Sequence, residues 1–544
     1  MKKSAILFLL LCVGTRSFAQ GTFSGDLQSN VNFFQKDPTI KASGNELYDS
    51  KLSGSDAWLS LRYTVGGFTF FARADAFDNS NLKNPLAANS DFGIGAWSIS
   101  KDVENLSITV GSIYDQIGSG ILFRSYEDRG LLIDNALVGL ELKYKLAPNI
   151  ILKGFTGQQK DNRKVVTNTR YAPVIKGFNA EGDFSAGKIH LIPGVGVLNR
   201  TIDNQSMTDI ASAINAQQLD TRFNPMYNMY AFAAYNTLTY KNFTWYAEGD
   251  YKTHEAILDT RPFSSTYRSL IDKPGNVEYT TLSYGRKGLA INFAGKRTET
   301  FVMRTSPNQT LLDGMMNWQP VVAVMRPQRL MSRYTPASQD MSEMAGSLNM
   351  VISPSDNTNY TLTGTYINTL DGKALYREAY GEVYTQKYKS WVLEGGVQYL
   401  EYNTPIYMVR PNGKYLYGIT PFAEITRKFT DTRSLRLEMQ YMYTKQDYGS
   451  WAFALLEYDV APKWSVSVSD MYNVVPNNTP GNIDYPNVKV PGNHYPSIFC
   501  AYTKGANRFT LAYVKQVDGI NCTGGVCRYE PAFSGVKATL ASSF

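Results

Sequence analysis

Residues 111–135 concentrate charges of both signs in a stretch that also contains isoleucine, leucine and phenylalanine. Charged groups withdrawn from bulk water are normally paired and hydrogen-bonded. The pattern therefore indicates either a structural ion-pair network or a constriction that filters solutes by charge and size. Gly111, Gly118 and Gly120 permit the tight or left-handed backbone that such a folded segment needs. The candidate residues are Asp115, Arg124, Glu127, Asp128, Arg129, Asp134 and Asn135.

Residues 305–342 form a second candidate segment, rich in methionine and arginine around one tryptophan. Methionine adapts its shape to a partner or an apolar ligand, and arginine and aromatic residues are enriched at protein interfaces. The segment can fold inward as a plug, fold outward as a docking surface, or pack on itself as a surface loop. The sequence leaves these alternatives open. The candidate residues are Met315, Met316, Trp318, Met325, Arg326, Arg329 and Arg333.

Two cysteines near the end of the chain lie close together. Cys522 and Cys527 flank the sequence Thr-Gly-Gly-Val. In an exported protein this spacing favours a disulfide across one loop, with two free thiols as the alternative. Cys500 lies in a strand-like run, where we expect it to pack without a partner.

Several function classes find no support in the sequence. None of the three histidines, His190, His254 and His494, has a metal-ligand spacing. The chain has no Gly-x-Ser-x-Gly nucleophile turn and no phosphate-binding loop. The formal net charge of +7 includes no basic tail or cluster of the kind that binds nucleic acid. We therefore expect no enzymatic activity, no cofactor, no metal and no nucleic-acid partner.

The elements that must position these segments are β-strands with a period of two. In residues 243–252, Trp245 and Tyr251 share one face, while Glu248 and Lys252 share the other. Successive side chains of a strand point to opposite faces. In a barrel embedded in lipid, the apolar face points outward and the polar face lines the lumen. The 37 tyrosines and 27 phenylalanines fit strands with aromatic girdles at the membrane interface.

The links between the strands alternate in length along most of the chain. Short links such as Gly66-Gly67 and Lys241-Asn242 alternate with long polar links such as 201–226 and 305–342. Bacterial outer-membrane barrels have short periplasmic turns and long extracellular loops. The sequence therefore predicts one all-β domain over residues 20–544. We expect a single antiparallel transmembrane β-barrel of about 24 strands, within a range of about 20 to 26.

The two ends of the chain agree with export. Residues 1–19 read as a cleaved signal peptide, with a positive start, an apolar run and small residues before Gln20. Cys12 raises the alternative of a lipoprotein, although Leu11 before it fits that signal poorly. No later run of 18 apolar residues predicts a transmembrane helix. Strand character begins at Phe23, so we expect no large N-terminal plug domain.

Two resemblances extend this interpretation. The alternating last strand, which ends on Phe544, resembles the assembly signal of bacterial outer-membrane β-barrels and implies an interaction with the barrel assembly machinery. The whole mature chain resembles outer-membrane barrels of Bacteroidota. Residues 115–120, 124–127 and 133–135 are similar to a motif of an uncharacterised barrel family in that group. The resemblance implies an outer-membrane location surrounded by lipid, and it brings no activity or site. The first segment also loosely resembles porins that export acidic polysaccharide.

Together these observations predict an integral outer-membrane barrel that acts as a porin-like channel for a small or oligomeric solute. Passage would be passive, with residues 111–135 narrowing the path. The alternative is a barrel that does not transport and scaffolds a larger surface or secretion assembly, with residues 305–342 docking an outer-membrane protein partner. An open lumen favours the channel, and a filled lumen favours the scaffold.

Overall fold

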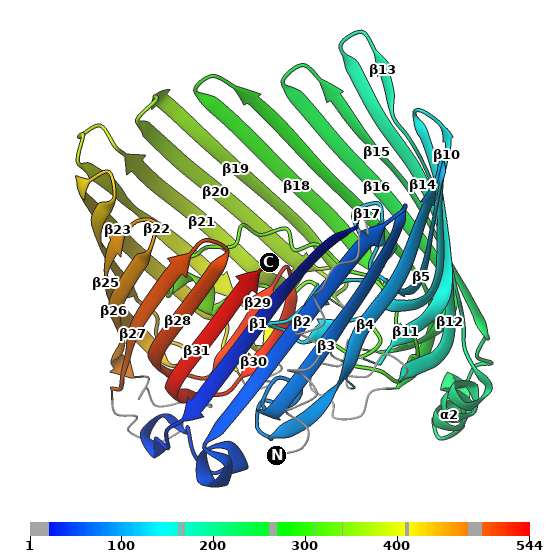
Figure 1. Cartoon of the computed structure of the whole chain (residues 1–544), viewed down its shortest axis with the longest axis horizontal. Coiled ribbons are helices and arrows are strands. Elements are labelled where there is room, and N and C mark those ends of the chain that lie inside the picture. Colours follow the sequence, from blue (N-terminus) through cyan, green and yellow to red (C-terminus); the bar gives the residue numbers. More distant parts are fainter. Residues whose placement is uncertain are drawn as a thin grey trace.

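A computed structural model describes residues 21–161, 164, 169–259, 269–310, 312–339, 341–408, 413–476 and 492–544. The chain folds into a closed antiparallel barrel of 24 strands, which confirms the predicted fold class and strand number (Figure 1). Of the described residues, no helix is sufficiently long and apolar to cross a membrane. The expected signal peptide, residues 1–19, lies outside the described residues.

The wall follows the chain order, and each strand pairs with the next wall strand. One strand is interrupted at Asp183, so that β12 and β13 are two pieces of it and both pair with β14. The wall strands are β1 (Thr22–Phe34), β2 (Ser53–Val65), β3 (Phe68–Ser80), β4 (Asn89–Val103), β5 (Leu106–Ile113), β10 (Leu137–Ala147), β11 (Ile150–Lys160), β12 (Arg170–Gly182), β13 (Phe184–Ala186), β14 (Ile189–Thr201), β15 (Asn228–Tyr240), β16 (Phe243–Leu258), β17 (Leu270–Arg286), β18 (Leu289–Glu299), β19 (Glu343–Ser355), β20 (Thr358–Thr369), β21 (Ala374–Thr385), β22 (Trp391–Tyr402), β23 (Leu416–Thr430), β24 (Arg433–Met442), β25 (Gly449–Val460), β26 (Trp464–Pro476), β27 (His494–Lys504), β28 (Asn507–Gln516) and β31 (Phe533–Ser543).

The barrel closes between its first and last strands. β1 pairs with β31 in an antiparallel register that places Asp26 opposite Ser543. Beyond the last strand, Phe544 exchanges two backbone hydrogen bonds with Gly25, at N–O distances of 2.8 and 3.0 Å. Closure leaves no unpaired strand edge in the wall, as a sheet surrounded by lipid requires.

The two faces of the wall have the polarity of a barrel in lipid. On β16, Trp245 and Tyr251 are 41% and 49% exposed on the outside. The alternate residues Glu248 and Asp250 are each only 4% exposed, because they point into the lumen. The same alternation recurs on β24, where Met439 and Tyr441 are exposed and the polar residues Glu438 and Gln440 are buried. The polar face is buried and the apolar face is exposed, which is the arrangement that the alternating sequence predicted.

The links divide between the two ends of the barrel. Short turns at one end, such as residues 66–67 and 241–242, alternate with longer links at the other, which carry the helices in Figure 1. Two of the links at the long-link end are themselves short, residues 370–373 and 443–448. The helical elements are η1 (Pro38–Ile40), η2 (Leu47–Lys51), α2 (Asn204–Asn215), η3 (Leu219–Thr221), η4 (Met331–Arg333) and α3 (Thr404–Tyr407).

Three links from the long-link end run inside the wall, and we call them the first (114–136), second (300–342) and third (517–532) lumen segments. Their buried side chains and their contacts with inward-facing wall residues place them there. Each of the first and third segments is organised by small hairpins of its own. These consist of β6 (Gln116–Ile117) with β7 (Phe123–Arg124), β8 (Glu127–Asp128) with β9 (Ile133–Asp134), and β29 (Gly519–Thr523) with β30 (Val526–Glu530).

Candidate functional site

The first lumen segment is fixed to the wall by a buried ion-pair cluster around Asp134. Its carboxylate pairs with Arg73 on β3 at 2.6 Å and with Lys160 on β11, and it accepts a hydrogen bond from the Tyr114 hydroxyl at 2.8 Å. Asp75 also pairs with Arg73, at 2.6 Å. Burial alone would raise the pKa of Asp134, but the charges of Lys160 and Arg73 outweigh it and hold that pKa below its ordinary value.

The charges that precede Asp134 in the same segment continue this cluster toward the seam of the barrel. Glu127 pairs with Arg73 at 2.9 Å and with Arg129 at 2.8 Å. The Arg129 guanidinium also donates to the Gln28 side chain on β1 at 3.0 Å. Asp128 instead stabilises its own turn, because it accepts a hydrogen bond from a backbone N–H three residues later. The cluster therefore joins β1, β3 and β11 through one inner segment.

At its other end, the first segment binds a second part of the wall. Asp115 pairs with Lys143 on β10 and Lys153 on β11, each at 2.8 Å. Gly118 has a φ of +56°, and a Cβ there would lie 2.4 Å from an Oε atom of Glu248 on β16. Both the backbone conformation and the close approach to the wall therefore favour glycine at this position.

Arg124 is held by aromatic rings. Its guanidinium carbon lies 4.5 Å from the ring centroid of Tyr126 and 4.6 Å from that of Trp318. Its backbone N–H donates to the Met316 carbonyl at 3.0 Å. Among the described residues it forms no ion pair with a carboxylate, so it takes no part in the ion-pair network that the sequence indicated as one alternative for this segment. Cation–π contacts satisfy its charge in place of an acid.

Asn135 joins the first segment to the second. Its side-chain amide donates to the carbonyl of Met315 at 3.1 Å, and its amide oxygen accepts from the backbone N–H of Tyr126 at 2.6 Å. Gln159 on β11 donates to the same Met315 carbonyl at 2.6 Å. Met315 and Met316 are buried between the two segments and the wall. The candidate residues from both parts of the sequence thus meet at one junction.

The second segment crosses the lumen. Near its start, Lys252 on β16 donates to the carbonyl of Val302 at 2.8 Å. Further along, Lys296 on β18 donates to the carbonyl of Pro320 at 2.8 Å. The segment then reaches a distant part of the wall, where Arg326 pairs with Glu378 on β21 at 3.3 Å. Beyond it, the backbone of residue 330 donates to a glutamine of β24 at 2.8 Å.

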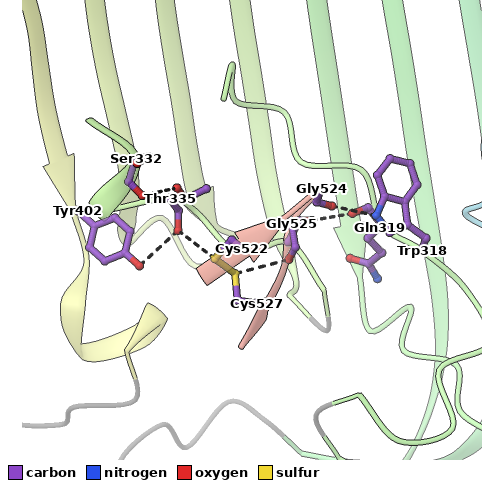
Figure 2. The surroundings of a disulfide bond; sticks show 10 residues. Trp318, Gln319, Ser332, Thr335, Tyr402, Cys522, Gly524, Gly525 and Cys527 are labelled. Carbon is purple, nitrogen blue, oxygen red and sulfur yellow. Dashed lines mark hydrogen bonds between the residues drawn. A yellow bond between two sulfur atoms is a disulfide. The ribbon is translucent and has the colours of Figure 1, made fainter. Parts of the chain in front are cut away.

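The third segment is a disulfide-bonded hairpin that packs against the second (Figure 2). Cys522 and Cys527 face each other across β29 and β30 and are bonded. The indole N–H of Trp318 donates to the carbonyl of Gly524 at the hairpin tip, at 2.8 Å. The backbone N–H of Ser338 donates to the carbonyl of Gly525, at 3.0 Å. Cys500 on β27 is a free thiol.

Two cavities border this hairpin. The Arg304 cavity has a volume of about 480 Å³ and is lined by residues of the second segment, by β16 and by Cys527. The Arg329 cavity has a volume of about 590 Å³ and is lined by residues 325–335, by residues 516–522 and by Tyr529 and Glu530. Met325 lines the second cavity and is 41% exposed. The lumen is therefore occupied by protein but retains space beside the hairpin.

Sequence reasoning did not identify the wall residues that hold the segments. Arg73 and Asp75 alternate with alanines on β3, and Glu248 and Lys252 alternate with outward-facing residues on β16. This period of two marks them as lumen-facing, but it does not indicate which segment they bind. Nor did the sequence identify residues 517–532 as an inner segment.

The structure offers no metal-binding cluster among the described residues. No group of three histidine, cysteine or acidic side chains within the described ranges could hold a metal ion. Each histidine lies beside a single aspartate: His190 beside Asp183, His254 beside Asp272, and His494 beside Asp470. These pairs are solvent-exposed, and they lie apart from the lumen segments.

A closed wall that is apolar outside and polar inside, with its own links filling the lumen, defines a transmembrane β-barrel. The chain belongs to a family of unknown function, DUF6029, which matches residues 1–544. No curated protein matches the chain.

Similar solved structures are also large barrels, at low identity. A mutant of the ferric enterobactin receptor PfeA from Pseudomonas aeruginosa shares 8% identity at a TM-score of 0.42, over 97% of this chain and 81% of the receptor. The FrpB iron transporter from Neisseria meningitidis shares 10% identity at a TM-score of 0.40, over 96% of this chain and 82% of the transporter. The translocation pore of the P pilus usher PapC shares 9% identity at a TM-score of 0.38, over 96% of this chain and 99% of the usher pore.

Proposed function

We propose that this protein is an outer-membrane channel that its three lumen segments hold closed at rest. When the segments move from the lumen, a small or oligomeric solute passes passively through the barrel. The exposed apolar belt and the closed wall support a membrane location. We further propose that the long-link end faces the cell exterior, and that the barrel assembly machinery recognises the last strand and Phe544.

The observation that carries this proposal is the interlocking of all three segments at residues 315–318. The first segment binds there through Arg124 and Asn135, and the third binds through the Trp318 side chain. The wall contacts of the segments involve β1, β3, β10, β11, β14, β16, β18, β21 and β24. A plug that is tied to so much of the wall blocks the lumen.

The same contacts indicate which segment opens the path. The first segment is anchored by buried ion pairs, which are costly to break. The second segment has one buried ion pair with the wall, Arg326–Glu378, and is otherwise held through its backbone by hydrogen bonds from or to wall side chains, which contribute about 1–3 kcal/mol each. Both cavities border the second segment. Its displacement would join them, so we assign the gate to residues 300–342.

Conductance in a planar bilayer tests this proposal. We expect the wild-type barrel to be mostly silent and a variant with residues 304–339 replaced by a short Gly/Ser link to conduct steadily. The matched control replaces residues 204–226, which carry α2 at the same end of the barrel and contribute no lumen segment. Heat-modifiable migration in gels verifies that each variant is folded. A steadily open wild type, or a folded deletion variant that stays silent, would contradict the gate.

The filled lumen also favours a second candidate, a barrel that scaffolds a larger surface assembly. On this alternative, the lumen segments stabilise the wall and do not move. The deletion variant then conducts, but no condition opens the wild type, and a partner protein co-purifies after extraction in mild detergent. Cross-linking before extraction separates a specific partner from one that is gained during purification.

A further inference from the structure

The Arg329 cavity contains three arginines of the second lumen segment. Arg326, Arg329 and Arg333 line it together with residues of the disulfide hairpin. Arg333 is the last residue of the short turn η4 and Arg329 lies just before this turn, so local backbone structure keeps their like charges close together. A concentration of guanidinium groups in an enclosed space is unfavourable unless anionic groups neutralise it.

Arg329 is the cation that the protein leaves without an anionic partner. Its side chain is exposed to solvent within the cavity, although many protein atoms surround its charged group. No acidic side chain of the described residues forms an ion pair with it. Burial, together with the charge of Arg333, lowers the pKa of Arg329 to about 10. The group therefore lies in surroundings that would favour a bound anion.

The two neighbouring arginines add unused donors. The Arg326 guanidinium stacks on Tyr380 at 3.6 Å and pairs with Glu378, yet one of its Nη atoms is buried without a hydrogen-bond partner in the described structure. Arg333 stacks on Trp451 at 4.5 Å, and its buried Nε also has no such partner. Buried donors are normally satisfied, so these two point to a missing acceptor.

The acidic residues that line the cavity hydrogen-bond or pair with groups other than Arg329, and one of them, Asp447, also interacts electrostatically with Arg333. Asp447 accepts a hydrogen bond from Tyr334 at 2.7 Å. Asp518 accepts one from Tyr448 at 2.8 Å. Glu530 pairs with Arg528, on the hairpin itself, at 3.0 Å. The rest of the lining includes apolar side chains, namely Met325, Met408, Val517 and Ile520.

We propose that the Arg329 cavity binds a small organic oxyanion, in which a phosphate, sulfonate or carboxylate group faces the three arginines and an apolar body faces Met325 and Ile520. Arginine suits this role because its planar donors match two oxygens of such an anion. The inference deepens the proposed function, on which its physiological meaning rests, because it assigns the channel an anionic solute. The binding step itself requires no opening of the gate.

Calorimetric titration of the detergent-solubilised full-length barrel tests the site, with phenyl phosphate as the probe. Phenol and inorganic phosphate separate the contributions of the apolar body and the anion. We expect phenyl phosphate to bind, phenol not to bind, and inorganic phosphate to bind more weakly. Arg329→Gln should weaken the binding of phenyl phosphate by about tenfold to a hundredfold, the usual effect of removing one charged hydrogen-bonding group. Arg329→Lys, which keeps the charge, should lose less affinity for phenyl phosphate.

Arg222→Gln is the matched control, because Arg222 is an exposed arginine at the same end of the barrel, outside the cavity. No binding of either phosphate to the wild type, or equal affinity for Arg329→Gln and the wild type, would overturn the anion site. Equal affinity for inorganic and phenyl phosphate would overturn the apolar half of the site. Conductance is measured separately, so a folded barrel that binds phenyl phosphate but never opens refutes the channel and not the binding site.

Discussion

Replacing Trp318 with alanine should open the barrel, because this one side chain contacts both other lumen segments. Its ring lies against the guanidinium of Arg124 in the first segment, and its indole N–H donates to Gly524 in the third. It also packs against a small apolar cluster that includes Leu131 and Val526. The substitution removes all three interactions and leaves the backbone hydrogen bond from Trp318 to Gly120 in place.

The size of the effect follows from these contacts. A cation–π contact of this kind contributes about 1 kcal/mol, and the hydrogen bond contributes about 1 kcal/mol. Because Trp318 is only half-buried, its lost apolar burial contributes roughly another 1 kcal/mol. A total of about 3 kcal/mol corresponds to roughly a hundredfold change in the ratio of open to closed barrels. This value applies if the open state has none of these contacts.

Single-channel recording measures this ratio directly as the open probability. Trp391→Ala is the matched control, because Trp391 lies on the outer face of β22, is 40% exposed, and also stacks with an arginine, Arg427, at 4.7 Å. We expect Trp318→Ala to raise the open probability by roughly a hundredfold and Trp391→Ala to leave it unchanged. If the two variants open equally often, Trp318 does not hold the plug and the reasoning fails.

Two further predictions concern the wall. Asp134→Asn should leave Arg73 and Lys160 buried with too little negative charge, and should destabilise the barrel by about 3–5 kcal/mol in urea unfolding. As the control, Asp183→Asn at an exposed turn should destabilise it by no more than about 1 kcal/mol. The pKa of Asp134 is lowered in the folded barrel, so its stabilisation is present above the ordinary aspartate pKa and disappears as the pH falls through the folded value. The difference in unfolding free energy between the wild type and Asp134→Asn should therefore shrink in acid. A difference that grows in acid would contradict this sign. Truncation after Ser543 removes two backbone hydrogen bonds to Gly25 and the ring contact with Phe23, and should lower the heat-modifiable fraction in membranes several-fold, whereas Phe509→Ala on the outer face of β28 should not.

The architecture could be predicted because its signal is local. Whether Trp245 points outward and Glu248 inward depends only on their positions within one strand. The alternation of short and long links likewise follows from reading the chain in order. The count of 24 strands therefore emerged without knowledge of any contact between distant residues.

The contents of the lumen could not be predicted in the same way, because they depend on contacts between residues that are distant in the sequence. The charges of residues 111–135 gave no indication that Asp134 meets Arg73 and Lys160, since both partners lie on other strands of the wall. Arg124 shows the same limitation, because its aromatic partner Trp318 lies in another segment. For residues 517–532, only the cysteine spacing marked the segment, and that spacing does not indicate depth within a barrel.

The seam between β1 and β31 has a consequence for how the molecule forms. Every other pair of wall strands joins consecutive stretches of chain, so the wall can zip from one hairpin to the next, but the seam must bring together the two ends of a long sheet. Closing a loop of this length has the largest entropic cost in the assembly and makes closure the slowest pairing. The first lumen segment contacts β1 through Arg129 and Gln28 and also contacts β16. Once it is folded, it curves the growing sheet and limits the separation of its edges. The first lumen segment thus helps to bring the two edges of the sheet together before the wall closes around it.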